Sequence, residues 1–378
     1  MNARSLPAIF LILLCPSCGR KQEGPSYKVE TIDGVKVVRN FNTASPRAVK
    51  PVEFVIDLSI GVEEGRENDM FVYPVDVDSD RSGDIYVLDY QDCIVKKYDA
   101  RGAFLKQFGR KGQGPGEFQS PGCLRVGDGN EIYVGDDHKV EVFSAEGEYQ
   151  RTLAVDLVGS FDIVEGGDLI FRHRTSDKTE GEYESLGRWD LLSHGTGDFL
   201  NQKVYWPARI MDDEFTYEFP YFVRWGVSSK RQIYAASAVD YAVSVFDSRG
   251  KLLLRFTKDI ASVPVSGEEM KRIEAIRARL PARAVENPYQ AKLVYPAFKF
   301  ISVDEADRVW VEHYQPGWRK RVHKETIYDV FSADGIFLFS TKIPGHLFPQ
   351  LKFKNGFVYA LMKHDSGFVS AVRMKIKE

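Results

Sequence analysis

The most regular feature of the sequence is a short apolar motif that recurs six times. Each copy is a triplet of apolar residues with strong β-forming character, and five copies carry Tyr or Trp at the centre. The copies are Ile85–Val87, Ile132–Val134, Leu169–Phe171, Ile233–Ala235, Val309–Val311 and Val358–Ala360. Three of the five intervals between copies are 47, 37 and 49 residues, close to a period typical of repeat folds in which each unit is a small β-sheet, and the other two are longer.

Short strands of alternating apolar and polar residues flank this motif. Val75–Asp78 and Phe300–Asp304 lie upstream of two copies, and four copies are followed by a strand that ends in a Gly turn. These downstream strands are Val95–Gly102, Val140–Gly147, Val243–Gly250 and Tyr328–Gly335. Four short strands bury little apolar surface alone, but radially stacked units bury it between neighbours. The pattern predicts an all-β fold, a six-bladed β-propeller.

Propellers protect their edges by joining the first and last segments of the chain. Val52–Leu58 is the best candidate for a strand that closes the last blade, and Val35–Val38 is a further edge strand. Blade 3, around Leu169–Phe171, departs most from the repeat, and its exact span stays open.

The longest interval between two copies, from Ile233 to Val309, contains a helical pattern. Ser266 and Glu269 form a capping box, and Pro281 ends the run that follows. The sequence therefore predicts a short helical insertion between blades 4 and 5, over about 264–296.

The segment Gly109–Phe118, GRKGQGPGEF, is followed by Pro121 and resembles the inter-repeat signature of NHL-type propellers. A phosphate-binding loop is the alternative, but no Gly-Lys-Ser/Thr follows, so we interpret the segment as a linker between blades. After about Tyr27 the chain resembles the exported six-bladed β-propeller proteins of bacteria. The resemblance implies the fold and leaves the function open.

The N-terminus has the features of an export signal. Leu6–Leu14 is too short to span a bilayer and fits the apolar region of a signal peptide. Ser17 followed by Cys18 resembles a lipobox, which implies a lipid on Cys18; an ordinary cleaved signal peptide is the alternative. We expect a signal peptide over 1–18, a tether with edge strands over 19–50 and the propeller over 51–378. The chain would then be an exported lipoprotein, anchored in the periplasm or on the cell surface.

The charge and the cysteine content narrow the expected partners and the expected state of the thiols. The chain has 51 basic and 54 acidic residues and no basic stripe, so nucleic acid is not an expected partner. Cys93 and Cys123 either form a disulfide, which an exported compartment permits, or stay as two buried thiols.

Candidate binding residues follow the six triplets at the loops that leave the second strands. In NHL-like propellers these loops face one end of the central channel. The candidates are Asp89, Tyr90, Asp136, His138, His173, Arg174, Tyr241, His313 and Lys363. Asp89, Asp136, His173 and His313 could together hold a divalent metal such as Ca or Zn, although Asp at such a position commonly caps a turn.

The sequence lacks a Gly-x-Ser-x-Gly elbow, a His-Glu-x-x-His motif and an EF-hand loop. We therefore interpret the chain as a binding or scaffold protein of the cell envelope without a cofactor, recognising a protein, peptide or glycan. The sequence does not decide whether the chain is an enzyme, and the missing motifs favour a protein that is not an enzyme. The alternative is a metal-dependent lyase or hydrolase that uses the Asp/His ring at the channel mouth.

Overall fold

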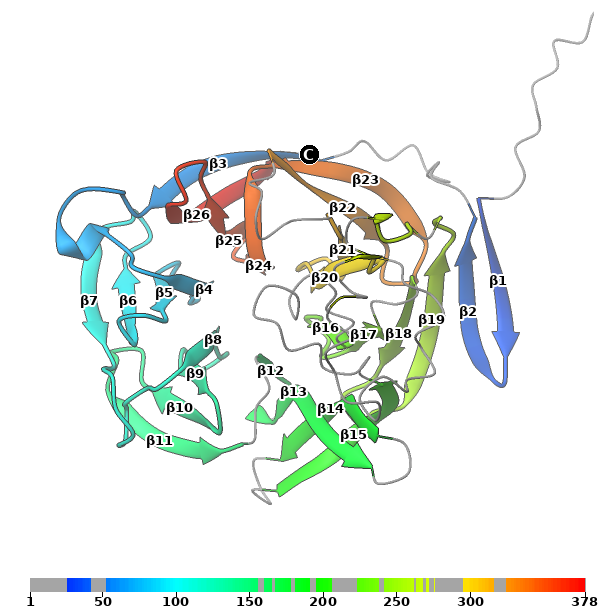
Figure 1. The fold of residues 1–378 in the computed structure, drawn as a ribbon, viewed down its shortest axis with the longest axis horizontal. Coiled ribbons are helices and arrows are strands. Elements are labelled where there is room, and N and C mark those ends of the chain that lie inside the picture. The colour runs from blue at the N-terminus through cyan, green and yellow to red at the C-terminus, as the bar shows by residue number, and fades with distance from the viewer. Residues whose placement is uncertain are drawn as a thin grey trace, which may run out of the picture.

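The computed structural model describes residues 26–41, 52–155, 160–164, 167–177, 181–190, 195–205, 223–237, 241–261, 263–267, 270–271, 275, 295–315 and 324–377. Within these ranges the strands form six sheets arranged around a common axis (Figure 1). In each sheet one strand faces the axis, and inner strands of neighbouring blades contact one another from blade 4 through blades 5, 6, 1 and 2 to blade 3. The chain is a six-bladed β-propeller, as the repeat predicts.

Blades 1 to 3 each have four strands, with the inner strand first in the chain. Blade 1 has β4 (Pro74–Ser79), β5 (Ile85–Asp89), β6 (Ile94–Tyr98) and β7 (Phe104–Phe108). Blade 2 has β8 (Pro121–Val126), β9 (Ile132–Asp136), β10 (Lys139–Phe143) and β11 (Tyr149–Ala154). Blade 3 has β12 (Phe161–Ile163), β13 (Leu169–Asp177), β14 (Gly181–Asp190) and β15 (Gly195–Tyr205), and it is the least regular of the three.

Blades 4 to 6 follow the same plan with two additions from the N-terminal region. Blade 4 has β16 (Val223–Val227), β17 (Ile233–Ser237), β18 (Ala242–Phe246) and β19 (Leu252–Lys258). Blade 5 has β20 (Phe298–Val303), β21 (Val309–His313), β22 (Glu325–Phe331) and β23 (Phe337–Pro344). Blade 6 has β24 (His346–Lys354), β25 (Phe357–Lys363), β26 (Val369–Lys377) and, from upstream of blade 1, β3 (Glu53–Ile60).

The six recurrent triplets all lie in the second strand of a blade, and their central aromatics explain part of the repeat. The hydroxyl of Tyr86 donates to the carboxylate of Asp80 at 3.0 Å, and the indole N–H of Trp310 donates to Asp304 at 2.9 Å. Both carboxylates also accept backbone amides of the turn that joins the first and second strands. In blades 1 and 5, a hydrogen bond therefore connects the central buried aromatic to the turn that precedes its strand.

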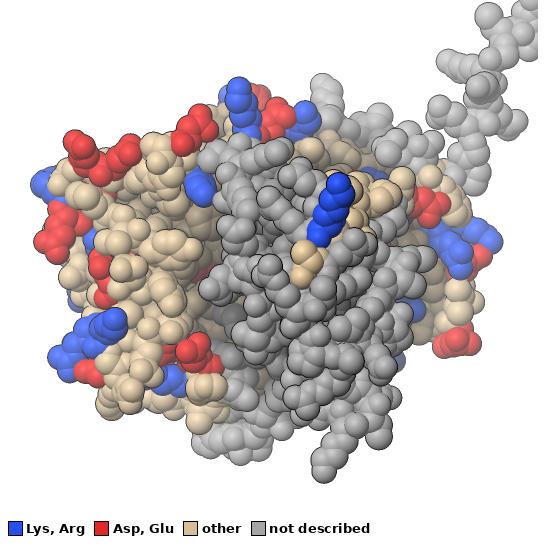
Figure 2. Space-filling model, in the orientation of Figure 1, with Lys and Arg blue, Asp and Glu red and all other residues tan. Residues whose placement is uncertain are grey.

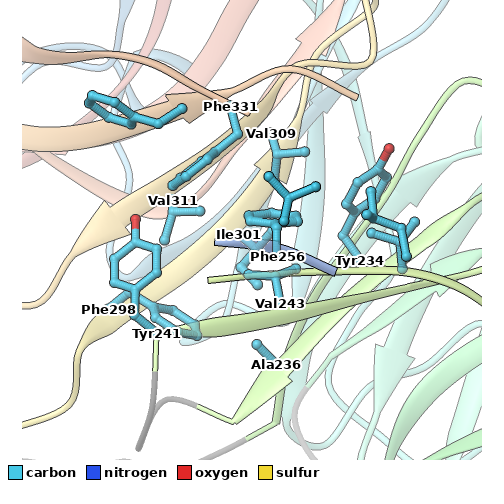
Figure 3. Packing of buried hydrophobic residues seen from close by; sticks show 14 residues of the cluster. Tyr234, Ala236, Tyr241, Val243, Phe256, Phe298, Ile301, Val309, Val311 and Phe331 are labelled. Carbon is cyan, nitrogen blue, oxygen red and sulfur yellow. The ribbon is translucent and has the colours of Figure 1, made fainter. Parts of the chain in front are cut away.

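The core lies between blades rather than within them. Figure 3 shows the cluster between blades 4 and 5, where Tyr234 and Phe256 of blade 4 meet Val309 and Phe331 of blade 5. The rings of Phe256 and Phe331 have centroids 4.9 Å apart. Burial of one such side chain contributes about 1.5–3 kcal/mol, so each blade depends on its neighbour for stability.

One Gly turn is required by this contact between blades. Gly335 has a φ of +77°, and a Cβ added there would lie 2.7 Å from a carbon of Phe256. A side chain at this position would displace the ring and strain the backbone. The recurrent Gly therefore serves the packing of the preceding blade as well as the turn.

Strand β3 closes the propeller by pairing antiparallel with β26, the last strand of the chain. Phe54 is buried and packs edge-on against Trp310 of blade 5, with ring centroids 5.6 Å apart. The prediction of a closing strand at Val52–Leu58 is confirmed. Two segments from opposite ends of the sequence thus complete one sheet.

A second N-terminal element, the hairpin of β1 (Tyr27–Ile32) and β2 (Val35–Asn40), extends blade 4. Strand β2 pairs parallel with β19 and makes that sheet six-stranded (Figure 1). The buried side chain of Asn40 donates to the carbonyls of Thr257 and Gly335 at 2.9 and 3.0 Å. Its amide oxygen accepts the N–H of Phe337 at 2.9 Å, which joins the hairpin to blade 5.

Replacing Asn40 with alanine is expected to lower the free energy of unfolding by about 1–3 kcal/mol, because a buried carbonyl and a buried N–H lose their partners. Chemical denaturation measures this loss, and hydrogen exchange of β1 and β2 should accelerate. The matched control is Lys36→Ala in the same strand, which removes an exposed ion pair with Asp334 and should cost at most about 1 kcal/mol. Equal losses for the two variants would contradict the anchoring role.

Three other sequence predictions have different outcomes. Gly109–Phe118 connects β7 to β8, so its assignment as a linker is confirmed. Cys93 and Cys123 are buried free thiols, which excludes the disulfide alternative. The helical insertion over 264–296 falls mostly outside the described residues and stays a prediction, although the N–H of Met270 does donate to the carbonyl of Ser266 at 2.8 Å.

Candidate functional site

Asp89 and Asp136 lie at the ends of second strands, as predicted, and the carboxylate of each accepts backbone amides. The carboxylate of Asp89 accepts the backbone amides of Val72 and Tyr73 at 2.7 and 3.1 Å. That of Asp136 accepts the amides of Gln119 and Ser120. Each carboxylate holds the segment that enters its own blade. Asp89 also accepts the amides of Gln91 and Asp92 in the turn that follows it, so the capping alternative is confirmed for Asp89. In the described part of the chain, no three His, Cys, Asp or Glu side chains cluster closely enough to hold a metal.

His313 and Tyr241 meet at a buried carboxylate between blades 4 and 5. Nε2 of His313 lies 2.9 Å from Oδ2 of Asp329, and the hydroxyl of Tyr241 donates to the same oxygen at 2.8 Å. The ammonium of Lys258 lies 2.6 Å from it, and Ser340 donates to Oδ1 at 2.6 Å. The sequence predicted two members of this cluster but not its centre, Asp329.

The electrostatics of this cluster are those of a buried ion pair between Lys258 and Asp329. Burial by itself would raise the pKa of Asp329, but the contacts with His313 and Lys258 outweigh it and hold the pKa well below the ordinary value. Burial and the neighbouring carboxylate of Asp329 raise the pKa of Tyr241 well above its usual range. Asp329 is therefore ionised and Tyr241 is a neutral donor near neutral pH.

The other candidate residues are dispersed. Tyr90 is exposed and packs edge-on against Tyr73, with ring centroids 5.9 Å apart. His138 is exposed in the turn after β9, and Lys363 ends β25. His173 and Arg174 lie in β13, and their side chains fall outside the described residues, as does Cys18. A rim site formed by these residues stays a prediction.

A cavity of about 180 Å³ lies at the opposite end of the central channel. In blade 1, Ser79 pairs with Ile85 and Pro74 with Asp89, so the inner strand ends at the other edge of the sheet from Asp89. The cavity wall comes from the final residues of the inner strands and their turns. It comprises Asp78, Arg125, Val126, Gly127, Asp128, Asp162, Ile163, Gly226, Val227, Ser228, Arg231, Ser302, Val303, Gln350, Leu351, Lys352, Phe353 and Lys354. All six blades contribute.

Buried ion pairs connect the inner strands that form this wall. On β4, Asp76 accepts the amide of Leu124 and the guanidinium of Arg125, at 2.9 and 2.8 Å. Asp78 accepts the amide of Val126 at 2.8 Å. Arg125 in turn contacts Asp162 of blade 3. The polar residues of the channel thus fix the first three blades relative to one another.

Sequence reasoning missed this cavity although its signal was present. Asp76 and Asp78 alternate on one strand, and Lys352 and Lys354 alternate on another. In blade 1 the two carboxylates are almost fully buried, which an exposed strand face would not show. Like-charged residues at alternate positions of an inner strand indicate a polar channel wall, because side chains two apart point to the same side.

Around the face shown in Figure 2, acidic and basic side chains are mixed among the described residues, without a broad field of one sign. This agrees with the near balance of charge in the sequence. The described residues of this face therefore present no basic field of the kind that binds a polyanion such as nucleic acid.

Comparisons with known proteins agree on the fold. The model of the DUF5128 family, described as a 6-bladed beta-propeller, matches residues 75–193. A protein of Bacteroides fragilis described as exported has 14% identity and a TM-score of 0.51, over 90% of this chain and 100% of its own. A DUF4221 family member from Bacteroides vulgatus has 14% identity and a TM-score of 0.54, over 87% and 99%.

At such identities the likeness shows the fold alone. No curated protein matches the sequence. Within the described residues, no helix is long and apolar enough to cross a membrane. The chain is a six-bladed β-propeller similar in fold to a propeller described as exported.

Proposed function

We propose that this chain is a non-catalytic binding protein of the cell envelope and that it takes its ligand in the cavity at the end of the central channel. The observation that carries the proposal is the construction of the cavity, to which all six blades contribute polar and charged side chains. Ligand sites are typically concave, with a few convergent polar groups. At about 180 Å³ the cavity suits a small ligand, or one end of a peptide or glycan.

Export and a lipid on Cys18 are part of this proposal. They are supported by the signal-like N-terminus and by the propeller of similar fold that is described as exported. The proposal also keeps the likeness of Gly109–Phe118 to the NHL linker. Mass spectrometry of the native protein with a Cys18→Ala control would detect the lipid. A metal-dependent lyase gains no support, since two of its four candidate ligands, Asp89 and Asp136, already accept backbone amides.

The test is ligand binding by the lipid-free chain over 19–378, with thermal shift against short peptides and soluble oligosaccharides. A ligand of the native state raises the melting temperature according to its affinity. Val227→Trp would fill the cavity, and Tyr90→Ala changes the exposed rim at the other end. We expect the first variant to abolish the shift and the second to preserve it. The reverse result would move the site to the predicted rim, and no shift with any probe would overturn the proposal.

A further inference from the structure

The charged side chains that line the channel cavity differ in whether the propeller itself provides a partner for them, and this difference indicates a ligand. Four cationic side chains and three carboxylates line it: Arg125, Arg231, Lys352, Lys354, Asp78, Asp128 and Asp162. A buried or half-buried charge is costly unless it is paired and hydrogen-bonded. We therefore consider which of these charges the propeller itself satisfies.

Lys354 is fully satisfied. Its ammonium has three donors, and it contacts three acceptors: the carbonyls of Ser79 and Val126 at 3.0 and 2.9 Å and the carboxylate of Asp78 at 2.9 Å. Burial alone would raise the pKa of Asp78, but Lys354 and Lys352 outweigh it and lower the pKa. Lys354 is therefore part of the structure of the wall, joining blade 6 to blades 1 and 2.

The two arginines are also engaged. Arg125 contacts Asp162 and lies 2.8 Å from Asp76. Arg231 contacts Asp128 and donates to the carbonyl of Ile163 at 3.3 Å. Asp76 contacts Arg125 but does not line the cavity itself. Its carboxylate balances the fourth cation of the wall, so the cavity and its surroundings are close to neutral overall.

Lys352 is the exception. It lies two residues before Lys354 on β24, lines the cavity and is half-buried. In the part of the chain that the structure describes, its ammonium forms no hydrogen bond and no ion pair. It influences the pKa of Asp78 in blade 1 and of Cys123 in blade 2, so its charge acts across the channel end.

We propose that Lys352 is the anchor for a single carboxylate group of a ligand held in the channel cavity. An ammonium group offers donors and no acceptor, so its partner must be an acceptor. A charge-assisted bond to a carboxylate is about twice as strong as a neutral one. This inference rests on the proposed binding function and specifies its ligand class.

A carboxylate fits better than a phosphate for two reasons. The wall is already close to neutral, so a second negative charge on the ligand would be repelled by Asp78 and Asp162. The small volume also favours a compact group. Two sources present this chemistry at a cell envelope: the C-terminus of a peptide and the carboxylate of a sugar acid.

The test compares acid and neutral forms of matched probes by calorimetry. Acetyl-Ala-Ala with a free C-terminus is compared with its C-terminal amide, glucuronate is compared with glucose, and inorganic phosphate is a further probe. The protein is the chain over 19–378, as wild type, Lys352→Met and Lys352→Arg. Lys251→Met is the matched control, because it removes the same charge from an exposed turn of blade 4 that does not line the cavity.

We expect one acid to bind at least about 10-fold more tightly than its neutral form, with the preference lost in Lys352→Met, partly restored in Lys352→Arg and kept in Lys251→Met. The acid that binds identifies the source. If neutral and acid forms bind equally and Val227→Trp blocks both, the cavity stands as the site and the carboxylate anchor is wrong. Tighter binding of phosphate would also overturn it. If no probe binds, both the anchor and the proposed function fall.

Discussion

Replacing Asp329 with alanine is expected to lower the free energy of unfolding by about 3–5 kcal/mol, because the buried ammonium of Lys258 would lose its counter-ion. Tyr241 and Ser340 would lose their acceptor as well. Urea denaturation followed by fluorescence measures the loss. Lys258 and Tyr241 belong to blade 4 and Asp329 to blade 5, so the change weakens the contact between two blades.

Asp334→Ala is the control, because Asp334 is an exposed aspartate of the same blade whose ion pair with Lys36 should contribute at most about 1 kcal/mol. The double variant Asp329→Leu/Lys258→Met should be less damaging than Asp329→Ala, since it removes both charges together. A loss in Asp329→Ala no greater than in Asp334→Ala would show that the cluster is not needed for stability.

This stabilisation also has a defined dependence on pH. The pKa of Asp329 is lowered in the folded state from an ordinary value of 3.8, so the folded state binds its proton less readily than the unfolded state. The contribution is therefore complete well above 3.8 and is lost as the pH falls through that value towards the folded pKa. The stability difference between wild type and Asp329→Asn should accordingly shrink on acidification below about pH 5.

The second large effect is expected at the closing strand. Phe54→Asp places a charge in the buried contact with Trp310 and should cost more than the roughly 3–5 kcal/mol typical of deleting a buried Phe. We expect β3 to detach from β26, with faster hydrogen exchange throughout β26 and a lower melting temperature. The freed edge should also promote association, visible as larger species in size-exclusion chromatography.

Ile56→Asp is the matched control in the same strand, because the side chain of Ile56 is 39% exposed. The same charge at this position should leave the closure intact. If Phe54→Asp and Ile56→Asp have the same melting temperature, pairing of β3 with β26 is not what keeps the propeller closed in solution. The contacts between blades would then be sufficient for closure.

The fold could be predicted from the sequence because the residues of each repeat determine the local structure of one blade. The triplet with its central aromatic, as at Tyr86, identifies a strand buried on both faces, and the Gly turn identifies the hairpin that follows. Closure could be predicted because Val52–Leu58 is the longer of the two N-terminal segments that have the pattern of an edge strand. The attachment of β2 to blade 4 could not, because parallel pairing depends on contacts such as Asn40 with Gly335, far apart in sequence.

The candidate site was harder to predict from the sequence than the fold. Aligning the repeats finds equivalent positions, and it correctly placed Asp89 and Asp136 at the ends of second strands, but it does not tell which equivalents have free side chains. That depends on neighbours such as the amides of Val72 and Gln119. Lys352 could not be distinguished from Lys354 either, because the difference arises only from what surrounds each ammonium across the channel.

The hairpin of β1 and β2 bears on how the protein would sit on its membrane. Under the proposed lipidation, Cys18 precedes Tyr27 by nine residues, which span at most about 30 Å when fully extended. Because Asn40 holds the hairpin against the outer side of blades 4 and 5, the anchor leaves from the circumference of the disc. Under that lipidation, the attachment point of the propeller would lie on its circumference and not at either end of the channel.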